Sequence, residues 1–113
     1  MKKNYHLCLS AGEEVLFRDH EDYNRGFNCF AIALYKTGAT GLVESFMSTH
    51  CHELVQTEVP DDLMYNFRLP YSMYFNRKYH SSVTLDYRMH RAIGCVCCDL
   101  LLAKPSCVVR KYL

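Results

Sequence analysis

The sequence predicts an α+β fold of the ferredoxin-like, split βαβ type. Two observations favour this fold: apolar residues alternate in short strand-like segments and recur at helical spacing in two longer ones, and the order of these segments over residues 4–79 is β-α-β-β-α. Only the last strand of the fold is missing from this order. The chain has 113 residues, half of them hydrophobic, so we expect one globular domain over residues 1–113.

The first strand and the first helix have clear signals. A strand is expected over residues 4–9, where Tyr5, Leu7 and Leu9 alternate with other residues. The helix is expected to begin after Asp19, which can cap its first turn, and to end at Gly38. Its apolar stripe is formed by Phe27, Phe30, Ala31 and Leu34.

Two more strands and a second helix follow. The strands are expected over residues 42–48 and 51–57, joined around Thr49. The helix is expected to begin at Pro60, and Pro70 should kink or split it, because proline lacks the N–H that an inner helical turn needs. The residues of this helix expected to face the core are Leu63, Met64, Phe67, Tyr71, Tyr74 and Phe75.

The segment from Ser81 onward has weaker patterns. Residues 93–103 fit either a buried helix or a strand, and residues 107–112 fit a short strand. The seven cysteines are odd in number and show no repeated pairing, and no signal-peptide pattern follows Met1. We therefore expect reduced thiols, a cytoplasmic location and no membrane span.

The charge of the chain is unevenly distributed. The formal net charge is only +1, so composition alone does not indicate a nucleic-acid-binding protein. From residue 58 onward, however, eight lysines and arginines stand against five acidic residues. This excess is typical of a solvated face, and a phosphate-binding patch is the sharper alternative.

The sequence His50-Cys51-His52 is the strongest candidate for chemistry. Side chains two residues apart on a strand leave by the same face, so both imidazoles should point one way and Cys51 the other. Two adjacent imidazoles form half of a divalent-metal site. The simpler interpretation is a pair of hydrogen-bonded histidines on a half-exposed strand.

Three segments resemble the HUH (His-hydrophobe-His) single-tyrosine transposases, and in particular the REP-associated tyrosine transposases. Residues 46–55 read Phe-Met-Ser-Thr-His-Cys-His-Glu-Leu-Val, and residues 71–80 read Tyr-Ser-Met-Tyr-Phe-Asn-Arg-Lys-Tyr-His. The opening residues 5–22, with Phe-Arg-Asp before the first helix, are similar too. The resemblance covers about residues 4–80.

The resemblance implies a function and assigns residues to it. By this similarity His50 and His52 would hold Mg²⁺ or Mn²⁺, which polarises a phosphate of single-stranded or hairpin DNA. A tyrosine would attack that phosphate, forming a 5′-phosphotyrosine, and strand rejoining would reverse the step. Tyr112 is the candidate nucleophile, and Arg77 and Lys78 would lie along the DNA. The protein would act as a monomer or a homodimer.

Departures from the family pattern leave alternatives open. The resemblance stops near residue 80, no Asn-Pro step follows, and Glu53 stands where an apolar residue is expected. Residues 81–113 could be truncated or come from a shifted reading frame, and the protein could be an inactive remnant that binds nucleic acid or only folds. A third interpretation is a small zinc-binding interaction module. Its soft ligands would be His90, Cys95, Cys97, Cys98 and Cys107.

Overall fold

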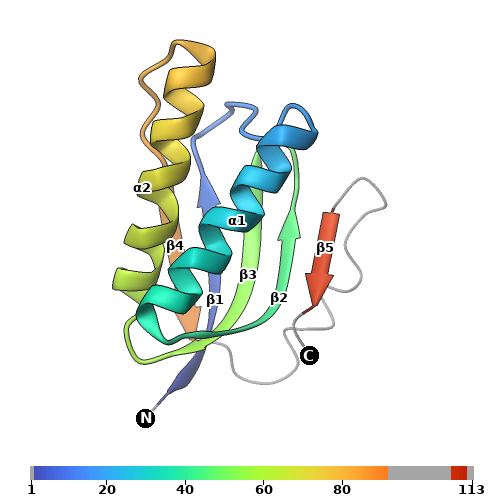
Figure 1. The fold of residues 1–113 in the computed structure, drawn as a ribbon. Helices are drawn as coiled ribbons and strands as arrows, with labels where there is room; N and C mark the ends of the chain where they lie inside the picture. The colour runs from blue at the N-terminus through green and yellow to red at the C-terminus, as the bar shows by residue number, and fades with distance from the viewer. Residues whose placement is uncertain (1, 92–107, 112–113) are drawn as a thin grey trace.

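The chain folds into one antiparallel sheet with two helices packed on one of its faces (Figure 1). The computed structural model describes residues 2–91 and the backbone of residues 108–111. Its elements are β1 (Lys3–Ser10), α1 (His20–Thr37), β2 (Thr40–Phe46), β3 (His50–Thr57), α2 (Pro60–Tyr79), β4 (Asp86–Arg91) and β5 (Val108–Lys111). The strands follow the order β4-β1-β3-β2-β5. The first four have the order of a ferredoxin-like sheet, so the predicted fold class is confirmed.

Strand β4 supplies the element that the predicted order lacked. It pairs antiparallel with β1, with Leu7 opposite Met89 and Leu9 opposite Tyr87. Met89 and Tyr87 are half-buried and pack against the core. The ferredoxin-like fold therefore continues to residue 91, beyond the point where the sequence resemblance ends. Strand β5 pairs with β2 and lies within the strand expected over residues 107–112, whereas residues 93–103 lie outside the described part of the chain.

Helix α1 begins and ends where its caps predict. The Asp19 side chain accepts a hydrogen bond of 2.9 Å from the backbone N–H of Asp22, which satisfies one of the exposed donors of the first turn. At the other end, Gly38 takes the left-handed conformation with φ of 69°, and its N–H bonds back to the last carbonyls of the helix.

Helix α2 runs unbroken through Pro70, so the expected split is wrong. Pro70 is exposed, and because it has no N–H, the carbonyl of Asn66 four residues earlier lacks its usual helical donor. On the inner side, Phe67, Tyr71 and Phe75 are completely buried against the rest of the core. Burial of these aromatic side chains on both sides of Pro70 holds the helix together.

The core lies between the helices and the sheet and is rich in aromatic rings. Gly26 of α1 sits so close to it that a Cβ atom there would lie 2.7 Å from the rings of Phe17 and Phe46. The buried hydroxyl of Tyr71 donates a hydrogen bond to the Leu16 carbonyl, which ties α2 to the loop before α1. Neither described helix is apolar over a stretch long enough to cross a membrane.

Two carboxyl groups are buried in this core. Glu44 of β2 and Glu53 of β3 are directly opposite each other and are completely shielded from solvent. Burial raises the pKa of Glu53 well above its ordinary value, and the neighbouring Glu44 raises this pKa further. Burial therefore favours the uncharged, protonated form of Glu53, which makes its place in an apolar layer tolerable.

Candidate metal site on the open face of the sheet

The two helices pack on one face of the sheet, and the two histidines of the motif lie on the other, which we call the open face because no described helix covers it. The name refers to the absence of a helix there, since Val43, Ser45 and Leu54 of this face are buried. Along β3, Cys51 and Glu53 point into the core and are fully buried, whereas His50 and His52 are half-buried on the opposite side. The ring centres of the two histidines are 4.9 Å apart, and the rings meet edge to face. The alternation expected from the sequence thus holds, and the imidazoles are neighbours.

Cross-strand pairing surrounds these histidines with polar side chains. In the register of the sheet, Cys8 of β1 lies between His52 and Arg88, and Ser10 lies between His50 and Asp86. Paired residues of neighbouring strands point to the same face of a sheet, so all of these residues share the open face. A pocket of about 410 Å³ opens here and is lined by Cys8, Ser10, Gly12, Thr49, His50, Asp86 and Arg88.

Each of the two histidines makes a hydrogen bond through its Nδ1 atom. The Nδ1 of His52 lies 3.0 Å from Nε2 of His6, which comes from β1. The Nδ1 of His50 lies 3.0 Å from the hydroxyl of Thr49, in the turn between β2 and β3. The rings of His6 and His52 are also stacked, with their centres 5.0 Å apart.

Burial keeps these imidazoles neutral. It lowers the pKa of His52, and the nearby His6 and His50 lower it further, to about 4. Burial also lowers the pKa of His50 below its ordinary value. Neutral imidazole carries the lone pair that a metal ligand needs, so both side chains are ready to bind a cation near neutral pH. Burial raises the pKa of the Cys8 thiol, which therefore stays protonated.

Two imidazole donors could hold only a cation that keeps most of its coordination positions for other ligands. Within the described residues, no group of three or more histidine, cysteine, aspartate or glutamate side chains is arranged to hold a metal ion. A cation here would thus have His50 and His52 as its ligands from the described residues. The remaining positions would be open to oxygen atoms of water or of a phosphate, the ligands that Mg²⁺ and Mn²⁺ favour.

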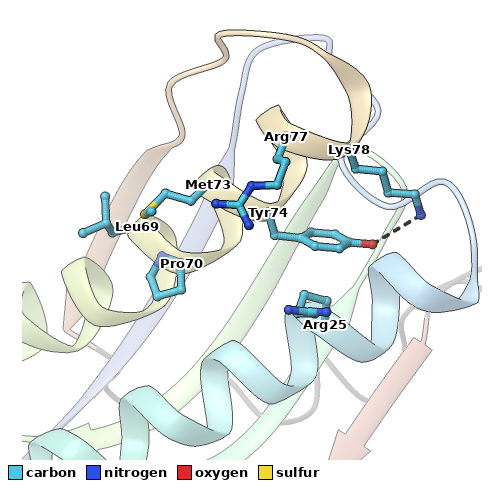
Figure 2. A pocket seen from close by; sticks show the side chains of 7 residues that line it. All are labelled: Arg25, Leu69, Pro70, Met73, Tyr74, Arg77 and Lys78. Atoms are coloured by element: carbon cyan, nitrogen blue, oxygen red, sulfur yellow. Dashed lines mark hydrogen bonds between the residues drawn. The ribbon is translucent and has the colours of Figure 1, made fainter.

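The two basic residues assigned by resemblance lie elsewhere in the molecule. Arg77 and Lys78 belong to α2, which covers the opposite face of the sheet, so the structure does not bring them together with His50 and His52 (Figure 1). Figure 2 shows the pocket of about 490 Å³ that they line on the helical side. Its lining residues are Arg25, Leu69, Pro70, Met73, Tyr74, Arg77 and Lys78.

The two basic residues of this second pocket, Arg77 and Lys78, differ in their surroundings. The ammonium group of Lys78 forms ion pairs of 2.8, 3.2 and 2.9 Å with Asp19, Glu21 and Asp22. Its hydrogen bond to Asp19 is the main reason that the pKa of Lys78 is raised. Arg77 is exposed at the rim of the pocket.

The remaining site predictions fall outside the described residues. These are the candidate nucleophile Tyr112 and the tail cysteines Cys95, Cys97, Cys98 and Cys107. The other proposed zinc ligand, His90, is exposed on β4 opposite His6.

Sequence reasoning missed three residues of the open face: His6, Thr49 and Arg88. The antiparallel register brings His6 of β1 and Arg88 of β4 to the histidine pair, whereas Thr49 lies in the turn directly before His50. The signal available for His6 was the alternation along the first strand, which places this residue on the face opposite the buried Leu7 and Leu9.

No protein-family model matches this sequence. No curated protein matches it either. Among solved structures, the chain is similar to a crystal structure described as "a putative transposase" from Deinococcus radiodurans, with a TM-score of 0.65 and 11% sequence identity. The match covers 89% of this chain and 87% of that chain. At this identity the similarity demonstrates a common fold.

Proposed function

We propose that this chain is a transposase-like protein that binds single-stranded or hairpin DNA and nicks and rejoins it with Mg²⁺ or Mn²⁺. The observation that carries the proposal is the pair of imidazoles, His50 and His52, side by side on the open face of a ferredoxin-like sheet. The fold shared with the Deinococcus radiodurans protein, described as "a putative transposase", supports the same assignment.

The open face suits a phosphodiester. A metal ion held by His50 and His52 would act as a Lewis acid toward a phosphate oxygen. Arg88 lines the adjoining pocket, and its guanidinium can donate paired hydrogen bonds to phosphate oxygens and neutralise their charge. The pocket of about 410 Å³ leaves room for the phosphate itself.

The covalent step requires a nucleophile from outside the described residues, and Tyr112 is our candidate. Its phenol oxygen would bond to phosphorus as the bond to the 3′ oxygen breaks. The phenol would lose its proton and the 3′ oxygen would gain one, leaving a 5′-phosphotyrosine and a free 3′ hydroxyl. Attack by a 3′ hydroxyl on the phosphotyrosine would rejoin the strand without an external energy source.

The helical side offers a second contact with the DNA backbone. The guanidinium of Arg25 lies 4.8 Å from the ring centre of Tyr74, and Arg77 projects from the same groove between α1 and α2 (Figure 2). Three carboxylates already neutralise Lys78, so we expect Arg77 to contribute more phosphate affinity than its neighbour.

A protein that binds DNA without cleaving it is the second candidate. One observation favours it: Tyr5 and Tyr87, the tyrosines of the described strands, pair with core-facing residues and so lie on the helical side of the sheet. The described residues therefore bring the histidine pair no strand-borne tyrosine nucleophile.

The first experiment is a Mn²⁺ titration by calorimetry of the wild type, His52→Ala and the exposed control His20→Ala. Binding that is lost only in His52→Ala supports the metal site, and equal binding by all three contradicts it. A Mn²⁺-dependent covalent adduct with hairpin oligonucleotides, lost in Tyr112→Phe, would support cleavage. An adduct that persists in Tyr112→Phe would remove Tyr112 from the scheme.

DNA binding is tested separately by fluorescence anisotropy with a labelled single-stranded oligonucleotide. Arg77→Gln should weaken binding and reduce the slope of affinity against salt by about one, the effect of one lost phosphate contact. Lys78→Gln should change this slope less. Lys36→Gln, exposed in the last turn of α1, is the matched control.

A further inference from the structure

The two histidines of the open face share a hydrogen-bonding pattern. In both, Nδ1 is engaged by a neighbouring side chain: His6 in the case of His52, and Thr49 in the case of His50. Each histidine therefore keeps Nε2 as the ring atom available for a ligand. The two neighbours come from different parts of the chain, so the pattern does not result from one local turn.

The tautomer of a neutral imidazole decides which nitrogen can bind a metal ion. One ring nitrogen carries the proton and donates, and the other carries the lone pair and accepts. Metal-binding histidines in proteins nearly always donate their second ring N–H to a neighbouring group, which fixes the ring and its tautomer. An acceptor next to Nδ1 thus leaves the lone pair on Nε2.

We propose that His6 and Thr49 are positioning residues, which accept hydrogen bonds from Nδ1–H of His52 and His50 and so leave both Nε2 atoms for a divalent cation. The inference rests on the metal site of the proposed function and assigns two residues to it. His6 acts through His52, and Thr49 acts through His50; neither is itself a metal ligand.

Both neighbours are held in place by the fold. His6 is half-buried in β1, which lies between β3 and β4, and its ring stacks on that of His52 at an interplanar angle of 29°. Thr49 lies in a tight turn closed by a hydrogen bond of 2.8 Å from Met47 N–H to the His50 carbonyl. Partners fixed in this way restrict each imidazole ring to one orientation before a metal binds.

The hydrogen bond between His6 and His52 can also form with His6 as the donor, and this arrangement leaves a different nitrogen of His52 for a metal ion. If His6 donated from Nε2, His52 Nδ1 would accept, and the proton of a neutral His52 would lie on Nε2. That atom could not bind a metal without losing its proton. The tautomer of His52 in the metal-free protein therefore tests the proposal directly.

The first test is a long-range ¹H–¹⁵N NMR spectrum of the metal-free, full-length protein near neutral pH. We expect the Nδ1–H tautomer for both His50 and His52 in the wild type. In His6→Phe the signals of His52 should move toward a mixture of tautomers, while those of His50 stay unchanged. Thr49→Val should do the reverse. A predominant Nε2–H tautomer of His52 in the wild type overturns the proposal.

The second test is the Mn²⁺ affinity of the same variants. Loss of a group that orients a metal ligand typically weakens binding by about 10–100-fold, and we expect this for His6→Phe and Thr49→Val. His6→Gln supplies an acceptor oxygen in place of the ring nitrogen, and Thr49→Ser keeps the hydroxyl, so both should restore most of the affinity. His20→Gln, exposed at the start of α1, is the control and should bind like the wild type.

The two tests separate failure of the inference from failure of the proposed function. Tight Mn²⁺ binding that His6→Phe and Thr49→Val leave intact refutes the positioning role and leaves the metal site standing. No Mn²⁺ binding by a folded wild type refutes the metal site and the positioning role that rests on it. Thermal melts followed by circular dichroism identify any variant that has lost its fold.

Discussion

The buried carboxylate of Asp22 should be one of the largest single contributors to stability in this chain. It lies at the start of α1, is fully shielded from solvent, and accepts four hydrogen bonds. Its donors are the Tyr74 hydroxyl at 2.6 Å, the Tyr79 hydroxyl, the Arg18 backbone N–H at 2.9 Å and the Lys78 ammonium at 2.9 Å. Through them it joins α1 to the last turns of α2. We predict that Asp22→Asn loosens this connection.

The expected loss follows from what the amide removes. Asn keeps the shape of the side chain, but it has one acceptor oxygen in place of two, and its NH₂ group would face donors. A hydrogen bond to a charged group contributes about 1.5–3 kcal/mol. Lys78 retains Asp19 and Glu21 as partners, so its charge is not left uncompensated. We therefore expect Asp22→Asn to lower the free energy of unfolding by about 3 kcal/mol, or the melting temperature by roughly 10 °C.

The pKa of Asp22 gives a similar contribution to the free energy of unfolding. It also gives the direction in which this contribution changes with pH. Burial alone would raise this pKa, but the hydrogen bonds lower it from the ordinary 3.8 to about 2. Such a difference corresponds to roughly 2.5 kcal/mol. Because the pKa is lower in the folded state, this stabilisation is complete above about pH 4 and is lost as the pH falls toward 2.

Urea denaturation followed by circular dichroism provides the assay. The wild type and Asp22→Asn should differ by about 3 kcal/mol near pH 6, and the difference should shrink steadily between about pH 4 and pH 2. Asp62→Asn, an exposed substitution in the first turn of α2, should change stability by less than about 1 kcal/mol. A difference for Asp22→Asn below about 1 kcal/mol, or one that is the same at pH 6 and pH 2.5, would refute the reasoning.

Three further substitutions test the core. Gly26→Ala should lower stability by about 1–3 kcal/mol, because its new methyl group would lie 2.7 Å from two phenylalanine rings, and a thermal melt equal to that of the wild type would contradict this. Tyr71→Phe removes the hydroxyl that binds the Leu16 carbonyl, and urea denaturation should show a loss of about 1–2 kcal/mol. Glu53→Gln should stabilise the protein near pH 8, because the amide does not ionise, and urea denaturation at pH 8 and pH 4 measures the change. The raised pKa of Glu53 makes the wild type lose stability as the pH rises above the ordinary 4.5, so this gain should disappear near pH 4.

Most of the fold was predictable because its signals are local. The caps of α1 at Asp19 and Gly38, and the alternation in β1 and β3, each depend on a few adjacent residues. Strand β4 was missed because its sequence Asp-Tyr-Arg-Met-His-Arg has no β-branched residue and only two large apolar ones. What makes it a strand is pairing with β1, more than 70 residues earlier in the chain. The split at Pro70 was wrong for the same reason, since tertiary packing offsets the local cost of the proline.

The candidate site was also predictable in part, because some of its features depend on local sequence and others on long-range packing. The shared face of His50 and His52 follows from the period of a strand and was expected. The hydrogen bonds of His6 and Thr49 depend on the register of β1 against β3 and on the shape of a turn, neither of which a sequence motif contains. For Lys78 the sequence could reveal a positive charge, but only the packing of α2 on α1 places three carboxylates around it.

The alternation along β3 has a consequence for how this protein can change in evolution. His50 and His52 face outward, whereas Cys51 and Glu53 face the core. Alternate residues of one strand therefore form the candidate site and the core. Point substitutions can alter either one separately. Insertion or deletion of a single residue inside the strand would move the residues on one side of the change to the opposite face, placing imidazoles in the apolar layer or a thiol and a carboxyl outward, unless a bulge absorbed it. Descendants of this chain should therefore keep the number of residues in β3 fixed and vary in length at the loops.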